Sequence, residues 1–324
     1  MAADLFLGFD ASNYTSSLAL VDAKGTIRFN GKIPLPVKAG ERGLRQSDAV
    51  FQHVKNYPLL LEQVRPFIGQ DRILGVGVSE SPRNAPDSYM PCFLAGIEAA
   101  TAFAAGAGIH LFRFSHQEGH LMAAAHGSGA GEDLFLRPYL GFHVSGGTTE
   151  MLFCRPNGSR LDIRCIGGSS DLHAGQLIDR IGVRMGLSFP AGPAIEEAAR
   201  VFAESGAEPP RGRDCAAGLV CHLSGLENLA AAEWEKSGDR GRTACFVLSS
   251  LALTLRSLLR NGRAAYGNLP ALFSGGVMSN RYLQSELGQC GETRFAPPAL
   301  SADNAVGIAL LAARSYRTKA EAKE

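Results

Sequence analysis

The sequence predicts an α/β protein of two lobes, because both halves of the chain open with the same pattern. Residues 4–22 run from an apolar segment through a small polar turn over 10–16 to a second apolar segment, which is typical of strand, turn and strand. Residues 139–154 repeat this arrangement around Ser145-Gly146-Gly147-Thr148-Thr149. A length of 324 residues also suits two domains. We therefore expect a structural duplication, with 1–135 as the N-terminal lobe, joined by a C-terminal helix over 303–324, and 136–302 as the second lobe.

Hydrophobic periodicity predicts the remaining elements of each lobe. In the first lobe we expect a third strand near 27–29, helices over 48–64, 91–106 and 118–126, and strands over 73–78 and 109–112. In the second we expect helices over 170–185, 194–203 and 245–260 and a strand over 269–273, with helix from 301 onward. Residues 204–218 are polar and rich in Pro and Gly, which indicates a connector.

Composition narrows the class of protein. The formal net charge is +1, so the chain has no overall electrostatic footprint for nucleic acid, although a partner subunit could supply a positive surface for RNA. The seven cysteines are scattered and form no C-x-x-C pair, which favours reduced thiols and a cytoplasmic location. We expect neither a signal peptide nor a membrane span.

Three turns of small residues indicate a nucleotide site: residues 10–16 are small and polar, and the turns at 145–149 and 274–277 each contain a Gly-Gly pair. Backbone N–H groups and hydroxyls at strand ends are what a phosphate needs, and glycine lets the backbone approach closely. One Gly-Gly pair is more often a plain turn. Three turns in order favour a nucleotide clamped between two lobes, as in actin, Hsp70 and the sugar kinases. The candidate residues are Ser12 in the first turn, Ser145, Gly146 and Gly147 in the second, and Gly275 and Gly276 in the third.

Two histidines four residues apart predict a metal site. His116 and His120 begin a run that reads as helix, so both imidazoles leave one face, one turn apart. Two neutral imidazoles so placed can share a divalent metal ion, and imidazole suits zinc, iron, nickel and copper. A third ligand must come from elsewhere. The alternative is that one imidazole packs or caps while the other is solvated.

Seven short motifs carry a resemblance to a known family. In order they are His116-Gln117-Glu118-Gly119-His120 (H-x-E-G-H), Val144-Ser145-Gly146-Gly147-Thr148-Thr149 (V-S-G-G-H-T), Ala174-Gly175-Gln176-Leu177-Ile178-Asp179-Arg180 (A-G-E-A-F-D-K), Pro190-Ala191-Gly192-Pro193 (P-G-G-P), Leu223-Ser224-Gly225-Leu226-Glu227 (F-S-G-L-K), Gly275-Gly276-Val277-Met278-Ser279-Asn280-Arg281 (G-G-V-x-x-N-R) and Ala302-Asp303-Asn304-Ala305 (T-D-N-A). Their order and spacing resemble the TsaD family, also described as glycoprotease-like, of the actin, Hsp70 and sugar-kinase superfamily. The match runs nearly end to end.

The resemblance implies a reaction and its cofactors. Members of this family transfer threonylcarbamoyl from threonylcarbamoyl-AMP to an adenosine of tRNA. It implies Asp303 as the third metal ligand, although this residue could instead cap the last helix. The implied ion is iron or zinc, with magnesium as a further possibility. The implied partners are an adenine nucleotide, tRNA reached through partner subunits, and a homo- or heterodimer contact through the N-terminal lobe, without a membrane.

The resemblance also assigns roles to individual residues. Asp10, at the end of the first strand, and Glu118, inside H-x-E-G-H, are the candidate catalytic carboxylates. Asp179 is expected to accept a hydrogen bond from the ribose. Gly192 is expected to let the backbone reach the ribose or base, and Asn280 to line the adenine side.

Several polar groups depart from the family pattern. Tyr14 stands where the family has a second acid, Thr148 replaces a histidine, and the two family lysines are Arg180 and Glu227. Such losses are expected to weaken transition-state stabilisation unless they are compensated. The alternative hypothesis is therefore a catalytically impaired paralogue that binds nucleotide as a partner subunit of a TsaD-type complex. An ATP-dependent small-molecule kinase has no use for H-x-E-G-H, and a metallopeptidase needs its Glu directly after the first His.

Overall fold

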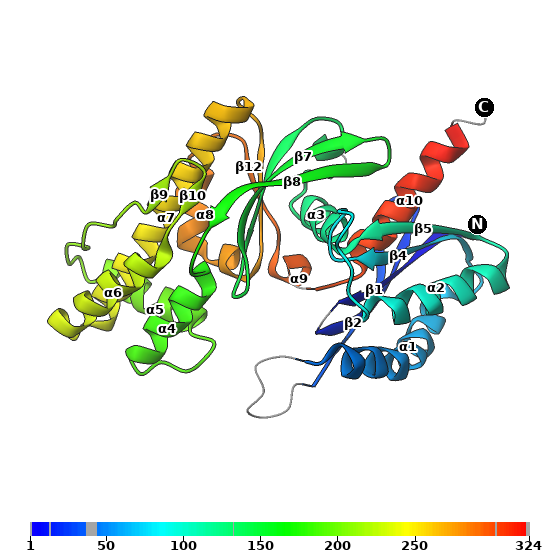
Figure 1. The fold of residues 1–324 in the computed structure, drawn as a ribbon, viewed down its shortest axis with the longest axis horizontal. Helices are drawn as coiled ribbons and strands as arrows, with labels where there is room; N and C mark the ends of the chain where they lie inside the picture. Colours follow the sequence, from blue (N-terminus) through cyan, green and yellow to red (C-terminus); the bar gives the residue numbers. More distant parts are fainter. Residues whose placement is uncertain (1, 13, 37–43, 132, 302, 322–324) are drawn as a thin grey trace. The chain divides into compact units, whose positions relative to one another are not determined.

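The computed structural model describes residues 2–12, 14–36, 44–131, 133–301 and 303–321, and they form two compact units (Figure 1). Unit 1 consists of Met1–Gly127, Pro156–Ile163 and Leu300–Glu324, and unit 2 of Ser128–Arg155 and Arg164–Ala299. The chain therefore returns to unit 1 twice, once briefly at 156–163 and once at its C-terminal end. The sequence pattern gives no sign of the brief return.

Unit 1 is a five-stranded sheet with helices on both faces. Its strands are β1 (Asp4–Ser12), β2 (Thr15–Asp22), β3 (Ile27–Pro34), β4 (Arg72–Ser81) and β5 (His110–Ser115), and its helices are α1 (Gln46–Ile68), α2 (Phe93–Ala107), α3 (His116–Gly127) and α10 (Val306–Glu321). The strand order is β3-β2-β1-β4-β5, in which β1, β4 and β5 run parallel.

Alternation along β1 decides which helices cover which face. Leu5, Leu7 and Phe9 point to one side, where they are fully buried in a cluster with residues of α1 and α2. Gly8 lies on the other side, where a Cβ atom would meet the backbone of Ala309 in α10 and of Ala305 just before it. The close approach of α10 to the sheet thus depends on the missing side chain.

Unit 2 is a seven-stranded sheet with a group of packed helices. Its strands are β6 (Tyr139–Val144), β7 (Thr149–Asn157), β8 (Arg160–Ser169), β9 (Ala216–Ala217), β10 (Val220–Cys221), β11 (Ala271–Ser274) and β12 (Thr293–Phe295). Its helices are α4 (Ala174–Arg184), α5 (Gly192–Glu204), α6 (Leu223–Ser237), α7 (Arg240–Tyr266), α8 (Arg281–Gly288) and α9 (Pro298–Ser301), with 3-10 turns η1 (Asp133–Phe135) and η2 (Gly276–Ser279). The last two residues of α9, the tip of β7 and the start of β8 fall in unit 1 by the division above.

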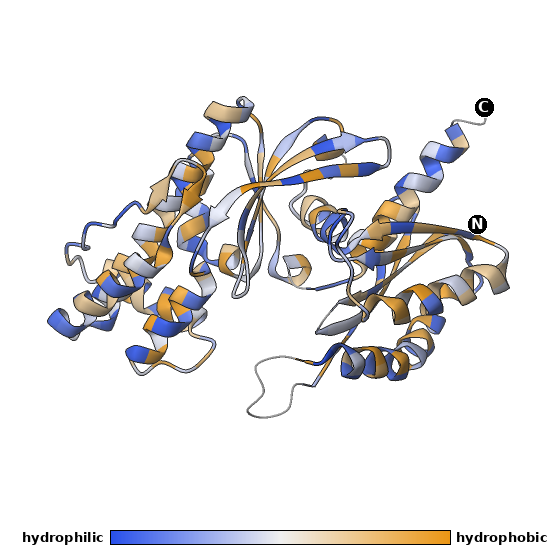
Figure 2. Cartoon of the chain, in the orientation of Figure 1, coloured by the Kyte–Doolittle hydropathy of each residue, from blue (hydrophilic) through white to orange (hydrophobic). Residues whose placement is uncertain are grey.

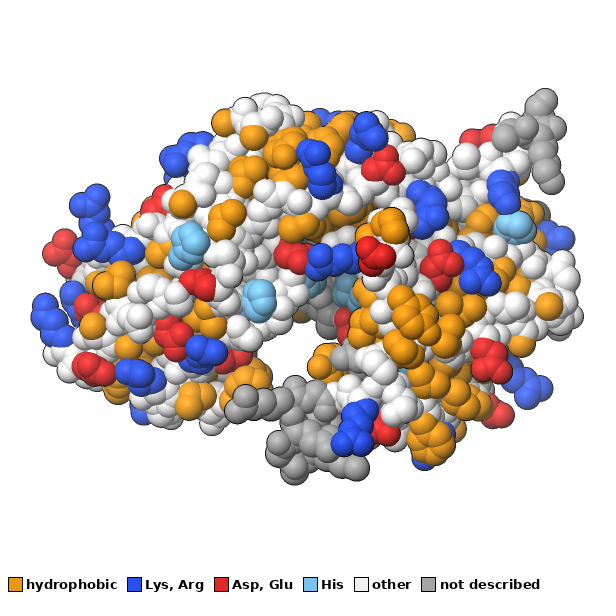
Figure 3. All heavy atoms as spheres, viewed as in Figure 1, with side chains coloured by type: hydrophobic (Ala, Val, Ile, Leu, Met, Phe, Trp, Pro, Cys, Tyr) orange, Lys and Arg blue, Asp and Glu red, His pale blue; other side chains and the backbone are white. Residues whose placement is uncertain are grey.

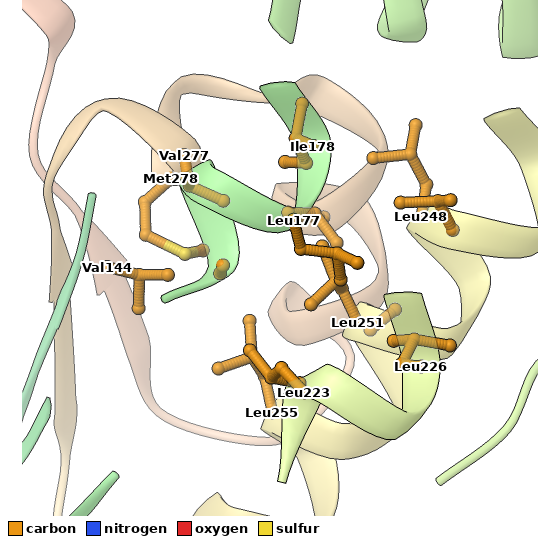
Figure 4. Close-up of a cluster of buried hydrophobic side chains, with 14 of the residues drawn as sticks. Val144, Leu177, Ile178, Leu223, Leu226, Leu248, Leu251, Leu255, Val277 and Met278 are labelled. Atoms are coloured by element: carbon orange, nitrogen blue, oxygen red, sulfur yellow. The ribbon is translucent and has the colours of Figure 1, made fainter. Parts of the chain in front are cut away.

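The core of unit 2 forms between its sheet and its helices. Figure 4 shows Leu177, Leu226, Leu251 and Leu255 converging from α4, α6 and α7, and all four are buried. Figure 2 shows apolar residues along the central strands and polar residues on the outer turns of the helices. Burial of this kind contributes about 25 cal/mol for each Å² of apolar surface removed from water.

The expected duplication is present in the strand order. Unit 1 has β3-β2-β1-β4-β5, and five of the unit 2 strands follow the corresponding order β8-β7-β6-β11-β12. Both predicted hairpins are confirmed: Ser12 pairs with Thr15 across β1 and β2, and Val144 pairs with Thr149 across β6 and β7. Unit 2 adds β10 and β9 outside β8.

Other expectations need correction. The helix expected from Ser170 begins at Ala174, because the Asp171 carboxylate accepts backbone hydrogen bonds from Leu223 and Ser224 at the start of α6. The C-terminal helix is divided into α9 and α10, and Asp303 lies in the bend between them; residues 302 and 322–324 lie outside the described part. Strand β8 was not expected, because its half-exposed residues do not alternate regularly.

One described helix, α7, is long and apolar enough in composition to cross a membrane. Its apolar window is 72% buried inside the protein, as in the core helix of a folded domain.

The crossing of α3 and α10 depends on two glycines. A Cβ atom at Gly307 would lie 2.6 Å from the carbonyl carbon of Gly119 and 2.9 Å from the amide nitrogen of Ala123. A Cβ atom at Gly119 would lie 2.8 Å from a side-chain carbon of Ile308. The two helix backbones therefore touch where neither residue carries a side chain.

We predict that Gly307→Ala lowers the free energy of unfolding by about 1–3 kcal/mol or more, because the added methyl group forces the two backbones apart. The measurement is equilibrium urea denaturation. Gly106→Ala, at an exposed position in the last turn of α2 with nothing within 4 Å of its Cβ position, is the matched control and should be neutral or stabilising. Equal stability of both variants would contradict the backbone contact.

Candidate metal and nucleotide sites

Three side chains of unit 1 meet around one point. His116 and His120 leave α3 one turn apart, and their Nε2 atoms lie 2.8 Å from each other. Asp303, before α10, places Oδ1 3.2 Å from the Nε2 atom of His120 and 3.6 Å from that of His116. The structure thus brings together the pair predicted from spacing and the ligand implied by the resemblance.

The geometry of these donors fits a metal ion. Bonds of about 2.1 Å from one ion at right to tetrahedral angles separate two donor atoms by about 3.0–3.4 Å. The three donor atoms here are separated by 2.8, 3.2 and 3.6 Å, which lie within about 0.2 Å of that range. Two imidazoles and one carboxylate are hard-to-borderline ligands that suit iron or zinc and leave further positions open.

Two further residues hold the ligands in place. Asp10 is fully buried, and its Oδ1 accepts a hydrogen bond from Nδ1–H of His116 over 2.8 Å. This bond fixes the tautomer that leaves Nε2 for a metal. The Ser12 hydroxyl donates to Oδ2 of Asp303 over 3.0 Å. Ser12, which the sequence assigned to the nucleotide, therefore lies beside the candidate metal ligand Asp303 in unit 1.

Electrostatics around the pair favours positive charge. Burial disfavours a charged imidazole, but the Asp10 and Asp303 carboxylates outweigh it and raise the pKa of His116 to about 10. Burial acts to raise the pKa of Asp303, yet hydrogen bonds from both imidazoles hold that pKa far below its usual range. The carboxylates that attract a proton here would equally attract a metal cation.

A buried hydrogen-bond network extends below this site. Nε2 of His53 lies 2.9 Å from the Ser12 carbonyl oxygen, and Nδ1 lies 2.7 Å from the Ser16 hydroxyl. Asn56 donates to the same hydroxyl over 3.0 Å. Sequence reasoning missed His53, because its partners lie about forty residues away and no local motif marks it.

Glu118 is placed differently from the other candidate catalytic acid. It is fully buried, and it accepts hydrogen bonds from the backbone and hydroxyl of Ser115 and from the Leu161 amide. Arg160 binds both of its oxygens, at 3.2 and 2.9 Å. These contacts fasten the start of α3 to the segment 156–163. They engage the carboxylate fully, so we assign Glu118 a positioning role rather than a catalytic one.

A cavity of about 380 Å³ lies within unit 2 at the predicted nucleotide residues. Five of them line it: Gly146, Asp179, Gly192, Gly276 and Asn280. Ser145, Gly147 and Gly275 belong to the same turns but are not among the lining residues. Gly275 has a φ of 97°, and a Cβ atom there would collide with the Val144 backbone, so glycine is required for the turn.

The chemistry of the cavity lining suits a nucleoside. Asp179 and Glu196 place two carboxylates in the wall, and carboxylates accept hydrogen bonds from ribose hydroxyls. Ile178, Pro190, Pro193 and Val277 supply apolar surface for a base. Glu196 was missed from the sequence; it follows Gly192 by four residues in α5, and that helical spacing was the available signal.

Two departures from the family pattern contact each other. Arg180 on α4 and Glu227 on α6 form an ion pair with N to O at 3.1 Å. The charge reversal at residue 227 is therefore partnered by the cation at residue 180. Tyr14 is 46% exposed, so packing in the core does not explain why an aromatic residue stands at this position.

The fold and these sites define an α/β protein of two units, with a His/His/Asp cluster whose donor atoms could hold a metal ion. A ROK hexokinase from Thermus thermophilus shares the fold, with a TM-score of 0.50 at 14% identity over 97% of this chain and 99% of that one.

Sequence comparison then fixes the family. The family model of TsaD, tRNA N6-adenosine threonylcarbamoyltransferase, matches residues 89–310. The chain is 32% identical to the tRNA N6-adenosine threonylcarbamoyltransferase of Streptococcus suis over 69% of its own length and 66% of that relative's. It is 26% identical to the Bacillus licheniformis protein of the same name over 94% and 90%. The chain belongs to the TsaD family.

We predict that metal affinity rises with pH up to about pH 10, because His116 holds a proton up to its pKa of about 10 and must release it to bind metal. The expected slope is about tenfold per pH unit from about pH 7 to about pH 8.5, whereas an ordinary histidine would be deprotonated above about pH 7.5. Zn²⁺ competition with a chromophoric chelator measures it.

Asp10→Asn is the control for this pH dependence. It removes the main charge that raises the pKa of His116. Affinity at about pH 10, where the proton no longer competes in the wild type, should fall by about 10–100-fold, and the slope between about pH 7 and about pH 8.5 should flatten because His116 loses its proton at lower pH. An equally steep slope in the variant would contradict the role given to Asp10.

Proposed function

We propose that this chain binds one divalent metal ion and an adenine nucleotide, and that it transfers threonylcarbamoyl from threonylcarbamoyl-AMP to an adenosine of tRNA. The observation that carries the proposal is the convergence of His116, His120 and Asp303, backed by Asp10. These residues come from three separate segments of the chain, and their convergence has no evident structural purpose without a ligand.

The metal ion, iron or zinc foremost, would act as a Lewis acid toward a carbonyl oxygen. The protein's own groups would do the rest. Asp10 orients the His116 ring and stabilises positive charge on it. Ser12 holds the Asp303 carboxylate in its orientation. Glu118 and Arg160 fix the start of α3, which carries both imidazoles.

The nucleotide would occupy the cavity of unit 2. Asp179 and Glu196 would accept hydrogen bonds from the ribose, and the glycines at 146 and 276 would let backbone N–H groups approach the phosphate. Asp179 is already oriented, because one of its oxygens accepts a hydrogen bond from the Ala191 amide over 2.7 Å.

The second candidate function is a nucleotide-binding partner subunit of a TsaD-type complex with impaired catalysis. Two observations favour it. Tyr14 stands where the family pattern has an acid. Arg180 and Glu227 stand where that pattern has two lysines, and their ion pair has no net charge. Both changes leave the metal ligands intact while altering groups that a reaction would use.

The proposal includes a cytoplasmic location and a partner that helps bring tRNA, since the formal net charge of +1 gives little attraction for RNA. It also includes a dimer contact through unit 1. Phe51, Val54, Leu59 and Phe67 on α1 are each more than half exposed. Figure 3 shows hydrophobic side chains gathered over this region. Apolar patches of this kind often mark protein interfaces.

We predict that the chain rescues cells that lack their own TsaD-family enzyme, and that His120→Ala abolishes the rescue, because loss of a metal ligand should slow transfer at least about hundredfold. The measurement is threonylcarbamoyladenosine in the tRNA of those cells. Failure of the folded, ADP-binding wild type, with rescue by Tyr14→Asp, would support the partner-subunit function instead. A folded protein that binds neither Zn²⁺ nor ADP would contradict both proposed functions.

We predict that Phe51→Asp shifts a purified dimer to monomer, because a buried unpaired carboxylate opposes association. Light scattering after size-exclusion chromatography measures the mass. Leu229→Asp on α6, an exposed apolar residue of unit 2, is the matched control and should stay dimeric. A wild-type chain that is monomeric alone and remains so with partner subunits would refute the contact.

A further inference from the structure

A second cavity in unit 2 has no role in the proposed reaction. Its volume is about 510 Å³, larger than that of the nucleotide cavity, and helices α5, α7 and α8 and the connector between α5 and β9 surround it. On α5 the lining residues recur at 196, 199, 200, 203 and 204, which is one continuous face of the helix. Figure 1 shows these helices side by side, and α7 packs against both α5 and α8.

The connector forms a fixed wall of this cavity. Its Pro209 and Pro210 line the space, and the residues that follow are tied to α7 by buried hydroxyls. The Arg213 amide donates to the Ser250 hydroxyl over 2.9 Å, and the Cys215 amide donates to the Thr254 hydroxyl over 3.0 Å. Two stiff prolines and these anchors keep the connector from collapsing into the space.

The lining combines apolar surface with two cations, Arg200 and Arg281, and two carboxylates, Glu196 and Glu204. Ala199, Ala203 and Leu248 contribute aliphatic surface. Arg200 is already paired, with Glu197 and Glu204. The Arg281 guanidinium lines the cavity and has no hydrogen-bond or ion-pair partner among the described residues, although its amide donates to Glu196 over 2.9 Å.

We propose that this cavity binds a small organic anion whose apolar body fills the space and whose acidic group pairs with Arg281. A volume of this size accommodates a drug-sized molecule. An unpaired guanidinium beside apolar walls favours a carboxylate, sulfonate or phosphate group over a neutral one, because guanidinium binds such groups with two parallel hydrogen bonds.

A ligand in this cavity is expected to change the affinity of the nucleotide cavity for its nucleotide. This consequence rests on the proposed function. Glu196 lines both cavities, and its carboxylate accepts a hydrogen bond from the backbone amide of Arg281. Arg281 follows Asn280, which lines the nucleotide cavity. A ligand that draws the Arg281 side chain toward itself acts on the residue next to Asn280 and on the carboxylate that both cavities share, so the ligand regulates nucleotide affinity.

The test uses two fluorescent probes that differ by one sulfonate. They are 8-anilinonaphthalene-1-sulfonate, which is an anion, and N-phenyl-1-naphthylamine, which is neutral. Wild-type protein should bind one equivalent of each with saturation. Ala203→Trp should abolish both signals, because the indole fills the cavity mouth. Val201→Trp is the matched control: it lies on the same helix, is 53% exposed and does not line the cavity, so it should change neither signal.

Arg281→Gln should weaken the sulfonate probe at least about fivefold and leave the neutral probe unchanged. Circular dichroism and thermal unfolding verify that each variant folds. Equal loss with Ala203→Trp and Val201→Trp, or no loss with either, would place the probes elsewhere and overturn the site. Equal effects of Arg281→Gln on both probes would overturn the anion preference.

The link to the nucleotide is measured separately, as ADP affinity with and without saturating sulfonate probe. We expect a change of at least about threefold, with the same factor in reverse for probe affinity. Identical ADP affinities would refute the coupling. If ADP fails to bind at all, the proposed function and the coupling fall together, while the probe results still decide whether the second cavity is a binding site.

Discussion

The contact between the backbones of Gly119 and Gly307 is the constraint on which the proposed metal ligands His116, His120 and Asp303 depend. It sets the distance and the crossing of α3 and α10, and the ligands lie on or just before these helices. Asp303 precedes α10 by a short bend, so a shift of that helix would carry the carboxylate away from the imidazoles. Because helices this close have no room for adjustment, the spacing between residues almost two hundred positions apart is set by packing rather than by the loops that join them.

Charge then complements packing. Two carboxylates, Asp10 and Asp303, flank the imidazole pair, and their combined field favours a cation at the point where the rings meet. A third carboxylate, Glu118, is kept out of this field by its ion pair with Arg160. Arg160 is 39% exposed whereas Glu118 is fully buried, so removing Arg160 would leave the buried carboxylate without its counter-charge. Helix α3 thus carries the two candidate ligands, His116 and His120, as well as Glu118, whose ion pair with Arg160 holds the start of the helix in place.

The sequence allowed some of this to be predicted. The duplicated hairpins and the spacing of His116 and His120 are local patterns, and both led to correct structure. Asp303, and Asp179, Gly192 and Asn280 of the nucleotide cavity, needed the family resemblance, because their partners lie far away in the chain, whereas the glycine turns were visible as local patterns. The role of Glu118 and the burial of His53 could not be foreseen, since each depends on side chains brought together only by the fold. The Arg180–Glu227 pair is similar: each change was visible in the sequence, but their mutual contact was not.

The tip between β7 and β8 illustrates a different consequence of these contacts. Turns at the ends of hairpins are where proteins usually accept inserted or deleted residues. This one holds Arg160, the counter-charge of a carboxylate buried at the start of α3, only two residues beyond the turn glycine Gly158. A change of length here would strand Glu118 without its partner. The tip is therefore a poor place to fuse a tag or a second domain, whereas exposed Gly106 at the end of α2 has open space around it.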